Sequence, residues 1–135
     1  MSNNTELKFT HYIVPKIKAE INPKFNFKET TNVSITPKFK REIITFNPNE
    51  FGNQLSILIN EEDNAPFILE ITVRGVFKLD NWQDEDNKDL VTTTSTSTLF
   101  PYLRTLVSNV TNQLGMTPYV LPLLNIKELF KEEQN

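Results

Sequence analysis

The sequence predicts an α+β fold: a four-stranded antiparallel meander sheet packed by one long and one short C-terminal helix, in a single domain over residues 1–135. In the first 80 residues, apolar side chains recur at every second position, as in strands with one buried face. From Leu99 the apolar spacing changes to three and four residues, as in helices. The length fits one hydrophobic core, and no internal repeat indicates a second domain.

The first strand is expected within residues 6–28, where odd positions are mainly apolar and even positions mainly polar. Alternate side chains of a strand point to opposite faces, so this pattern indicates one apolar and one solvated face. Tyr12 and Val14 break the alternation, which indicates local burial on the other face. Pro15 and Pro23 cannot donate hydrogen bonds to a neighbouring strand. We therefore expect this strand to be interrupted or to lie at a sheet edge.

Three more alternating segments follow, around residues 33–43, 55–59 and 67–79. Short turns rich in Asn, Pro and Gly separate them, so segments adjacent in sequence are expected to pair in an antiparallel meander. Gly75 lies inside the last segment and predicts a bulge or close backbone packing. Such a sheet has to cover its apolar face with another layer. Residues 81–98, an acidic stretch followed by a Thr/Ser run, are expected to form the loop that leads to this layer.

The long helix is expected to begin at Leu99. Its apolar side has helical spacing and consists of Leu99, Leu103, Leu106, Val107, Val110 and Leu114. Ser97 or Thr98 would cap this helix, and Pro101 would occupy its first turn, where a missing N–H has no intrahelical partner to lose. Gly115 would end it in the left-handed conformation.

A second, short helix is expected from Asn125, after a connector that contains two prolines. Glu128 lies three residues further on, as in a capping box. The apolar side of this helix would be formed by Ile126, Leu129 and Phe130. The helical layer therefore spans residues 99–131, followed by a short disordered end.

The composition offers little for catalysis, metal binding or nucleic-acid binding. The chain has no cysteine, so it has neither a thiolate nucleophile nor a Cys-ligated metal. His11, the one histidine, is interpreted as a half-buried strand residue. Asp84 to Asp86 are interpreted as a solvated loop, because Lys88 stands where a calcium loop needs an oxygen ligand. A net charge of -3 argues against nucleic acid as partner. We expect no enzyme activity, no cofactor and no metal site.

The N-terminus lacks the basic and apolar regions of a secretion signal. No apolar run approaches the roughly 20 residues that cross a bilayer. We therefore expect a cytoplasmic protein without membrane insertion. The abundance of Lys, Asn and Ile is typical of an AT-rich bacterial genome.

Phenylalanine is unusually frequent, with 10 in 135 residues. A core between one sheet and one helical layer does not accommodate all of them. We expect about two thirds of these rings in the core and the others at a binding or oligomer surface, because exposed apolar patches mark such surfaces.

The stretch Leu99-Phe100-Pro101-Tyr102-Leu103-Arg104 resembles the Leu-Phe-Pro-Tyr-x-Arg signature that opens the long helix of SecB, the bacterial protein-export chaperone. Residues 115–118 and 124–130 are similar to the connector and second helix of that family, and residues 67–77 to its last strand. The likeness covers most of the chain and is specific from Phe67 to Phe130.

The resemblance implies the same sheet-and-helix fold, with subunits paired through edge strands and helices, and pairs stacked into tetramers. We therefore expect a homodimer or homotetramer. It further implies an ATP-independent holdase, whose unfolded or partly folded clients lie in apolar grooves beside the helices. The candidate groove residues are Phe77, Leu79, Ile126, Leu129 and Phe130. For each of them the alternative is an ordinary core position.

Two features differ from the family members that deliver clients to the SecA motor, which use an acidic sheet surface and a charged C-terminal tail. Here the chain ends shortly after Phe130, and its first segment carries lysines instead: Lys16, Lys18, Lys24 and Lys28. SecA therefore stays an open alternative as a partner. Because SecB-like proteins also serve antitoxins, a second hypothesis is a dedicated partner of one specific protein. The third hypothesis is a small-ligand or catalytic domain, for which the sequence lacks the residues that would carry out chemistry.

Overall fold

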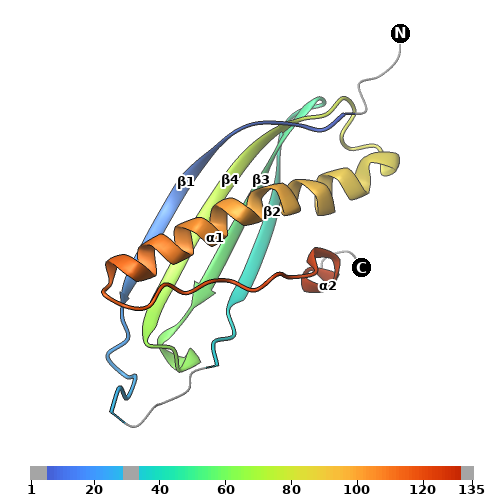
Figure 1. Ribbon diagram of the computed structural model, residues 1–135. Coiled ribbons are helices and arrows are strands. Elements are labelled where there is room, and N and C mark those ends of the chain that lie inside the picture. The colour runs from blue at the N-terminus through green and yellow to red at the C-terminus, as the bar shows by residue number, and fades with distance from the viewer. Residues whose placement is uncertain (1–5, 29–33, 132–135) are drawn as a thin grey trace.

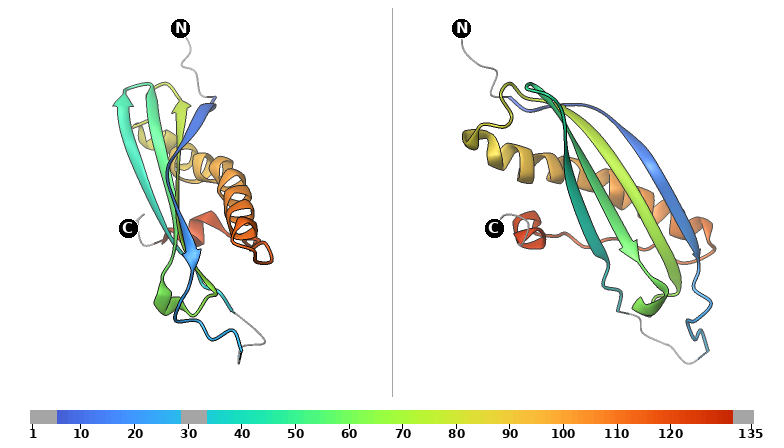
Figure 2. Two further views of the ribbon diagram at one scale, coloured as in Figure 1. Left: turned by 90° about the vertical axis from the view of Figure 1, so that its left-hand side faces the viewer. Right: turned by 180° about the vertical axis from the view of Figure 1, so that it is seen from behind.

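The computed structural model describes residues 6–28 and 34–131, which form two layers (Figure 1). One layer is a four-stranded antiparallel sheet, and the other contains a long helix that crosses one face of that sheet (Figure 2). The strands are β1 (Lys8–Ile21), β2 (Lys38–Asn47), β3 (Glu50–Ile59) and β4 (Phe67–Lys78). The helices are α1 (Ser95–Gln113) and α2 (Ile126–Leu129), with 3-10 turns at Glu61–Asp63 and Glu85–Asn87 and a π-helical turn at Leu90–Thr94. The fold class is confirmed, and the end predicted to be disordered, after residue 131, lies outside the described residues.

The strand order is β1-β4-β3-β2, so only β2, β3 and β4 form the expected meander. The prediction that β1 pairs with β2 is wrong, because these two strands lie at opposite edges of the sheet (Figure 1). β1 pairs instead with β4. The edge position predicted for β1 is confirmed, and β2 forms the other edge.

Two register shifts change which residues of β1 face the helix. They lie between Phe9 and His11 and between Ile13 and Lys16. A strand has a side-chain period of two, so one extra residue moves all later side chains to the other face. After the second shift Ile17 lies opposite Ile71 and faces α1 again. The apolar–polar alternation predicted for the first strand therefore holds only within the segments that the two shifts separate.

Between these two shifts the predicted faces are exchanged. Tyr12 and Val14 were expected to be buried on the other face, but both lie on the helix side. Tyr12, opposite Gly75, is exposed, and Val14 is half-buried. His11 was expected on the apolar face, half-buried; it is exposed on the other face. There the Nδ1 atom of His11 lies 3.0 Å from the Oγ1 atom of Thr10, a contact between two surface groups.

The core lies between α1 and the inner strands of the sheet. Leu99, Leu103 and Val107 of α1 are completely buried. They pack on a set of equally buried sheet residues: Leu55, Ile57, Leu69, Ile71 and Val73. The alternation predicted for β3 and β4 thus sets one continuous apolar face against the apolar stripe of α1.

The expected loop at residues 81–98 is wrong in its second half, because the Thr/Ser run is helical. Its hydroxyls donate to carbonyls one turn earlier, as Thr92 does to Lys88 and Thr96 to Thr92. These bonds occupy hydroxyl groups that would otherwise compete with the helix for backbone partners. The side-chain amide of Asn53 also donates to Ser95 Oγ and Thr96 Oγ1, at 2.7 and 2.9 Å, which ties this helix to β3.

The helix therefore begins before Leu99, and the cap predicted at Ser97 or Thr98 is wrong. Pro101 lies inside α1 rather than in its first turn, so one backbone hydrogen bond is missing there. The predicted end is confirmed: Gly115 follows the helix with φ of 84°.

The start of α2 is also confirmed. The side chain of Asn125 accepts a hydrogen bond from the Glu128 backbone N–H at 3.2 Å. This bond satisfies one of the N–H groups that a helix leaves free at its start.

Replacing Gly75 by alanine is expected to destabilise the protein. A Cβ atom at this position would lie 2.6 Å from Leu99 Cδ2 and 2.9 Å from the ring of Phe77. The close packing predicted from the sequence thus brings α1 onto β4, and overpacking there costs about 1–3 kcal/mol. Urea unfolding of Gly75→Ala should show a lower midpoint. An unchanged midpoint would contradict this close approach.

Candidate polypeptide-binding surface

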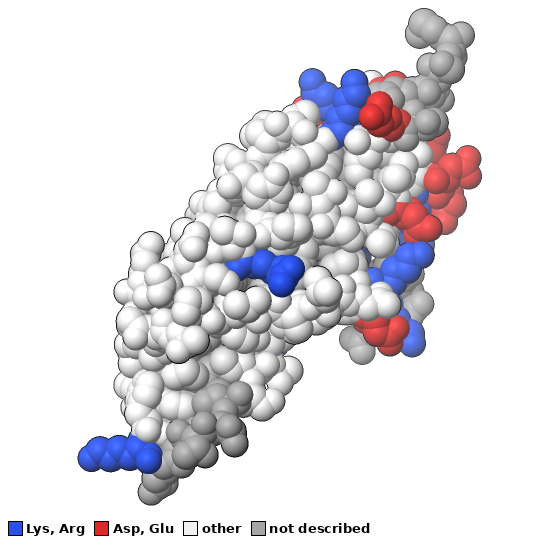
Figure 3. Space-filling view, in the orientation of Figure 1, with Lys and Arg blue, Asp and Glu red and all other residues white. Residues whose placement is uncertain are grey.

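The face of the molecule that carries α1 has almost no charge. Between Leu90 and Ile126 the only charged residue is Arg104. The space-filling view shows a broad white surface over α1 and the following connector, with the acidic and most of the basic residues at its margins (Figure 3). Such a surface favours contacts with apolar groups over charged ones.

The connector, residues 114–125, runs back along α1 in an extended conformation (Figure 1). Side chains of α1 hold its backbone. Arg104 Nε donates to the Leu121 carbonyl at 3.1 Å, and Ser108 Oγ donates to the Tyr119 carbonyl at 3.0 Å. The Tyr119 N–H donates to Thr111 Oγ1 at 2.8 Å. The charged side chain of Arg104 thus bonds to the backbone of this protein's own connector.

This tethering leaves apolar side chains of the connector in solvent. Leu121 is completely buried, whereas Leu123 is 88% exposed and Val120 is 61% exposed. An exposed leucine close to an exposed valine, on an uncharged surface, is typical of a site that another apolar group covers.

The first hollow lies where the connector leaves α1. It encloses about 470 Å³ and is lined mainly by Phe25, Phe27, Ile35, Phe67, Met116 and Tyr119. Phe25 is buried, but Phe27 stacks edge-on against it at 4.8 Å and is 53% exposed. Burial raises the pKa of the Tyr119 hydroxyl above its ordinary value, so this group stays neutral. The hollow therefore presents aromatic surface without charge.

Asn22 fixes the segment that brings these phenylalanines to the hollow. Its side-chain amide donates to the carbonyls of Glu61 and Ala65, at 3.0 and 2.9 Å, and its backbone N–H donates to the Pro66 carbonyl. Asn22 is buried, so these bonds replace the water that it loses.

The second hollow lies further along the connector. It encloses about 150 Å³ and is lined by Ser97, Phe100, Pro101, Arg104, Leu123, Leu124 and Ile126. Of the two exposed residues, Val120 lies between the hollows along the chain, and Leu123 lines the second one. We call the two hollows with these two residues the connector surface.

A separate apolar patch follows the edge strand β1 on the α1 side. Ile17 is 53% exposed, Ile21 43%, Tyr12 40% and Tyr102 of α1 37%. The rings of Tyr12 and Tyr102 lie 4.6 Å apart. We call these four residues the β1 edge patch.

Among the candidate groove residues, Phe77 and Leu79 are completely or almost completely buried. These two occupy ordinary core positions, which a client cannot reach in this conformation. Ile126 is largely buried but lines the second hollow, and Leu129 is half-buried. Phe130 is buried under the guanidinium of Arg41, 4.4 Å from its ring centre. A role of Ile126, Leu129 and Phe130 in client binding stays a prediction.

The signature residues at the expected helix start have divided roles. Leu99 is a core residue, and Phe100 packs against Phe39 at 5.6 Å. Pro101 lines the second hollow, and Tyr102 belongs to the β1 edge patch. Arg104 ties the connector to the helix.

No cluster of three or more metal-ligating side chains occurs in residues 6–28 and 34–131. Asp84 to Asp86 lie at the 3-10 turn Glu85–Asn87 and are exposed. In the same described ranges no helix is long and apolar enough to span a membrane.

The sequence did not identify Phe27, Val120 and Leu123 as site residues. The surplus of phenylalanine indicated the first, but the connector has no periodicity that distinguishes its exposed residues from its buried ones.

Comparison with protein families gives a match to a model described as preprotein translocase subunit SecB, over residues 18–135. An uncharacterized protein of Methanocaldococcus jannaschii is 29% identical over 125 residues, 89% of this chain and 79% of that protein. The protein-export protein SecB of Aromatoleum aromaticum is 25% identical over 111 residues, 80% of this chain and 70% of its own. SecB of Neisseria meningitidis is 30% identical over 74 residues, 55% of this chain and 50% of its own.

Two solved structures share the fold. One is the SecB-like chaperone Rv1957 of Mycobacterium tuberculosis in complex with a ChAD peptide from the Rv1956 HigA1 antitoxin. It has a TM-score of 0.69 and 18% identity, over 87% of this chain and 90% of that one. A protein of unknown function from Streptococcus agalactiae has a TM-score of 0.55 and 10% identity, over 87% and 98%. With a family model that matches most of its length, this chain belongs to the SecB family.

Proposed function

We propose that this protein is an ATP-independent holdase that binds unfolded or partly folded polypeptides in the cytoplasm. The observation that carries the proposal is the connector surface, where Phe27, Val120 and Leu123 are exposed around two hollows on a face nearly free of charge. Many weak apolar contacts along an extended client select for unfolded chains rather than for a sequence.

The two hollows suit an extended client better than a compact ligand. Residues 120–122 separate them along the connector, so one segment that covers both has to be extended. An extended chain points alternate side chains to one side, which suits separate hollows of this kind. Membership of the SecB family supports the same activity.

A homo-oligomer is the second part of the proposal. The β1 edge patch combines four partly exposed apolar side chains with the unpaired backbone of an edge strand. Both features favour pairing with another chain. A second copy offers the same patch and the same edge, as a two-fold dimer requires.

A dedicated client is the alternative candidate. The related chaperone Rv1957 was solved with a peptide of an antitoxin, which supports a SecB-like protein that serves a single partner. Delivery to SecA is a further candidate, but the lysines on the sheet give it little support. Capture of one stoichiometric protein from the native host, rather than many proteins, would favour the dedicated client.

The test of the holdase is aggregation of a chemically denatured protein after dilution, followed by light scattering. At near-stoichiometric amounts this protein is expected to delay aggregation, because the exposed apolar groups of the client find partners on the connector surface. Serum albumin at equal mass controls for non-specific protein effects. No delay with any of several unrelated clients would refute the holdase.

A further inference from the structure

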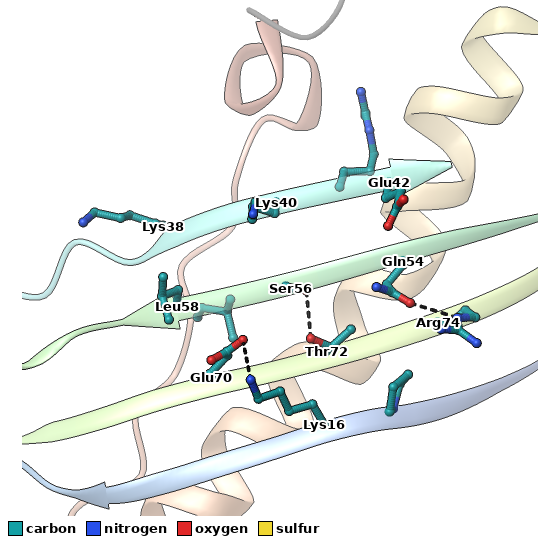
Figure 4. Close-up of a pocket in the computed structure, with 13 residues that line it drawn as sticks. Lys16, Lys38, Lys40, Glu42, Gln54, Ser56, Leu58, Glu70, Thr72 and Arg74 are labelled. Atoms are coloured by element: carbon teal, nitrogen blue, oxygen red, sulfur yellow. Dashed lines mark hydrogen bonds and ion pairs between the residues drawn. The ribbon is translucent and has the colours of Figure 1, made fainter. Parts of the chain in front are cut away.

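The sheet face turned away from α1 forms a trough with basic sides. Strands β3 and β4 form its floor, and the edge strands β1 and β2 form its sides (Figure 4). The trough encloses about 990 Å³. It lies on the opposite side of the sheet from the connector surface, so a second partner can occupy it at the same time.

The register places short side chains on the floor of the trough, between lysines of the two edge strands. Lys16 of β1 lies opposite Thr72, Thr72 opposite Ser56, and Ser56 opposite Lys40 of β2. The two central hydroxyl groups are short and bond to each other at 2.8 Å. Strands lie about 4.8 Å apart, so the two lysine backbones are about 14 Å apart across this floor. Figure 4 shows these lysines on either side of Ser56 and Thr72.

The lining has an excess of positive charge, although the whole chain has a net charge of -3. Among the lining residues that point to the open face, the basic ones are Lys16, Lys38, Lys40 and Arg74, and the acidic ones are Glu42 and Glu70. The Lys16 ammonium is 3.1 Å from the Glu70 carboxylate, whereas Lys38 has a long contact of 3.8 Å with Asp63. Lys40 has no hydrogen-bond or ion-pair partner within residues 6–28 and 34–131. On the β2 side, Lys40 therefore carries a charge without an ion-pair partner in these described residues, and Glu42 lies two positions further along the strand.

We propose that this trough binds an extended, acidic polypeptide segment of a partner protein. Carboxylates complement the excess lysines. Side chains of an extended segment alternate in direction, so acidic residues at every second position all point to one side and can face Lys38 and Lys40 of β2. The hydroxyl groups of Ser56 and Thr72 and the amide of Gln54 offer hydrogen bonds to the peptide backbone on the floor.

Nucleic acid fits this trough less well than an acidic peptide does. The described lining contains no aromatic side chain on which a base could stack. Glu42 and Glu70 would face a continuous row of phosphates, whereas a peptide can place neutral residues beside them. A second copy of this face is also disfavoured, because its lysines would meet lysines.

The test measures fluorescence anisotropy of a short labelled peptide of alternating Glu and Ser with the full-length protein. The double variant Lys38→Gln/Lys40→Gln is expected to weaken binding about fivefold, since each exposed ion pair contributes up to about 1 kcal/mol. The matched control, Lys88→Gln/Lys127→Gln, removes equal charge at two positions outside the trough and should change affinity less than twofold. Binding should also fall with salt.

Several outcomes would overturn the proposal. These are no binding of the Glu/Ser peptide, equal binding of a Gln/Ser peptide, or equal weakening in both double variants. A single-stranded oligonucleotide that binds more tightly than the peptide, and loses affinity in Lys38→Gln/Lys40→Gln, would assign the trough to nucleic acid instead. Because both lysines lie on the face opposite the connector surface, the aggregation assay should be unchanged in Lys38→Gln/Lys40→Gln.

Discussion

The double variant Phe27→Ser/Leu123→Ser is expected to lose most of its ability to delay aggregation of a denatured client, by about fivefold or more in the amount of protein required. Each substitution removes an apolar side chain from one of the two hollows. Phe27 is 53% exposed and Leu123 is 88% exposed, so most of the lost contact area belongs to the client and not to the fold. Light scattering across a titration measures the effect.

The matched control is Phe46→Ser. Phe46 is 46% exposed, close to the value for Phe27, but it lies on the other face of the sheet, where its ring covers Gly52. This variant should retain the activity of the parent protein. Thermal unfolding of both variants should show only small shifts, because exposed substitutions rarely change stability by more than about 0.5 kcal/mol. Equal loss of activity in Phe46→Ser, or full activity in the double variant, would show that the connector surface is not where clients bind.

The sequence predicted the elements well where one interaction dominates. In β3 and β4 both alternation and burial follow the core, and Gly115 and Asn125 end and begin helices through local backbone bonds. These features depend on residues close together in the chain. The close packing at Gly75 was also predicted correctly, because a glycine inside an apolar strand leaves room that a neighbouring element fills.

Other features depend on partners that are distant in sequence. The sequence between β1 and β2 has no pattern that indicates that these strands lie at opposite edges of the sheet. The two shifts in β1 exchange the faces of His11 and Tyr12 without any glycine to indicate them. The Thr/Ser run is helical, and Asn53, far away in sequence, bonds to its Ser95 and Thr96. Tertiary contacts override weak local propensity in each case.

The candidate site shows the same division. Phe77 and Leu79 continue an alternating strand, and continuity of the strand places them in the core rather than at a groove. Leu123 follows a proline in a segment without regular structure, so its exposure depends on how Arg104 holds the neighbouring Leu121 carbonyl. A surplus of apolar residues indicates that a surface exists, but only the tertiary structure says which residues form it.

The two faces of the sheet differ in chemistry, which has a consequence for assembly. The face under α1 is covered and mainly apolar, whereas the trough on the other side carries exposed lysines. Like charges oppose stacking through the trough. Association of copies is therefore expected at the β1 edge patch, where charge is low and the strand edge is unpaired.

Replacing Ile17 and Ile21 by lysine is accordingly expected to convert the proposed homo-oligomer into a monomer of 15.7 kDa. These side chains are 53% and 43% exposed in one copy, so a lysine can point into water there, but in a dimer two pairs of ammonium groups would lose their water at the contact. Natural proteins also place lysines on edge strands to prevent those strands from pairing with another chain. Light scattering coupled to size-exclusion chromatography measures the mass directly.

The control for this loss of mass is Phe46→Lys, which adds a lysine at the opposite edge, on β2, in place of a ring that is 46% exposed. It should leave the oligomer intact if the copies associate through β1. A monomeric parent protein, or an oligomer that persists in Ile17→Lys/Ile21→Lys, would contradict the assembly through this patch. If the monomeric variant still delays aggregation, each copy carries a complete connector surface. If it does not, clients need the surface that two copies form together. Weak apolar contacts hold a chain only when enough of them act on the same molecule.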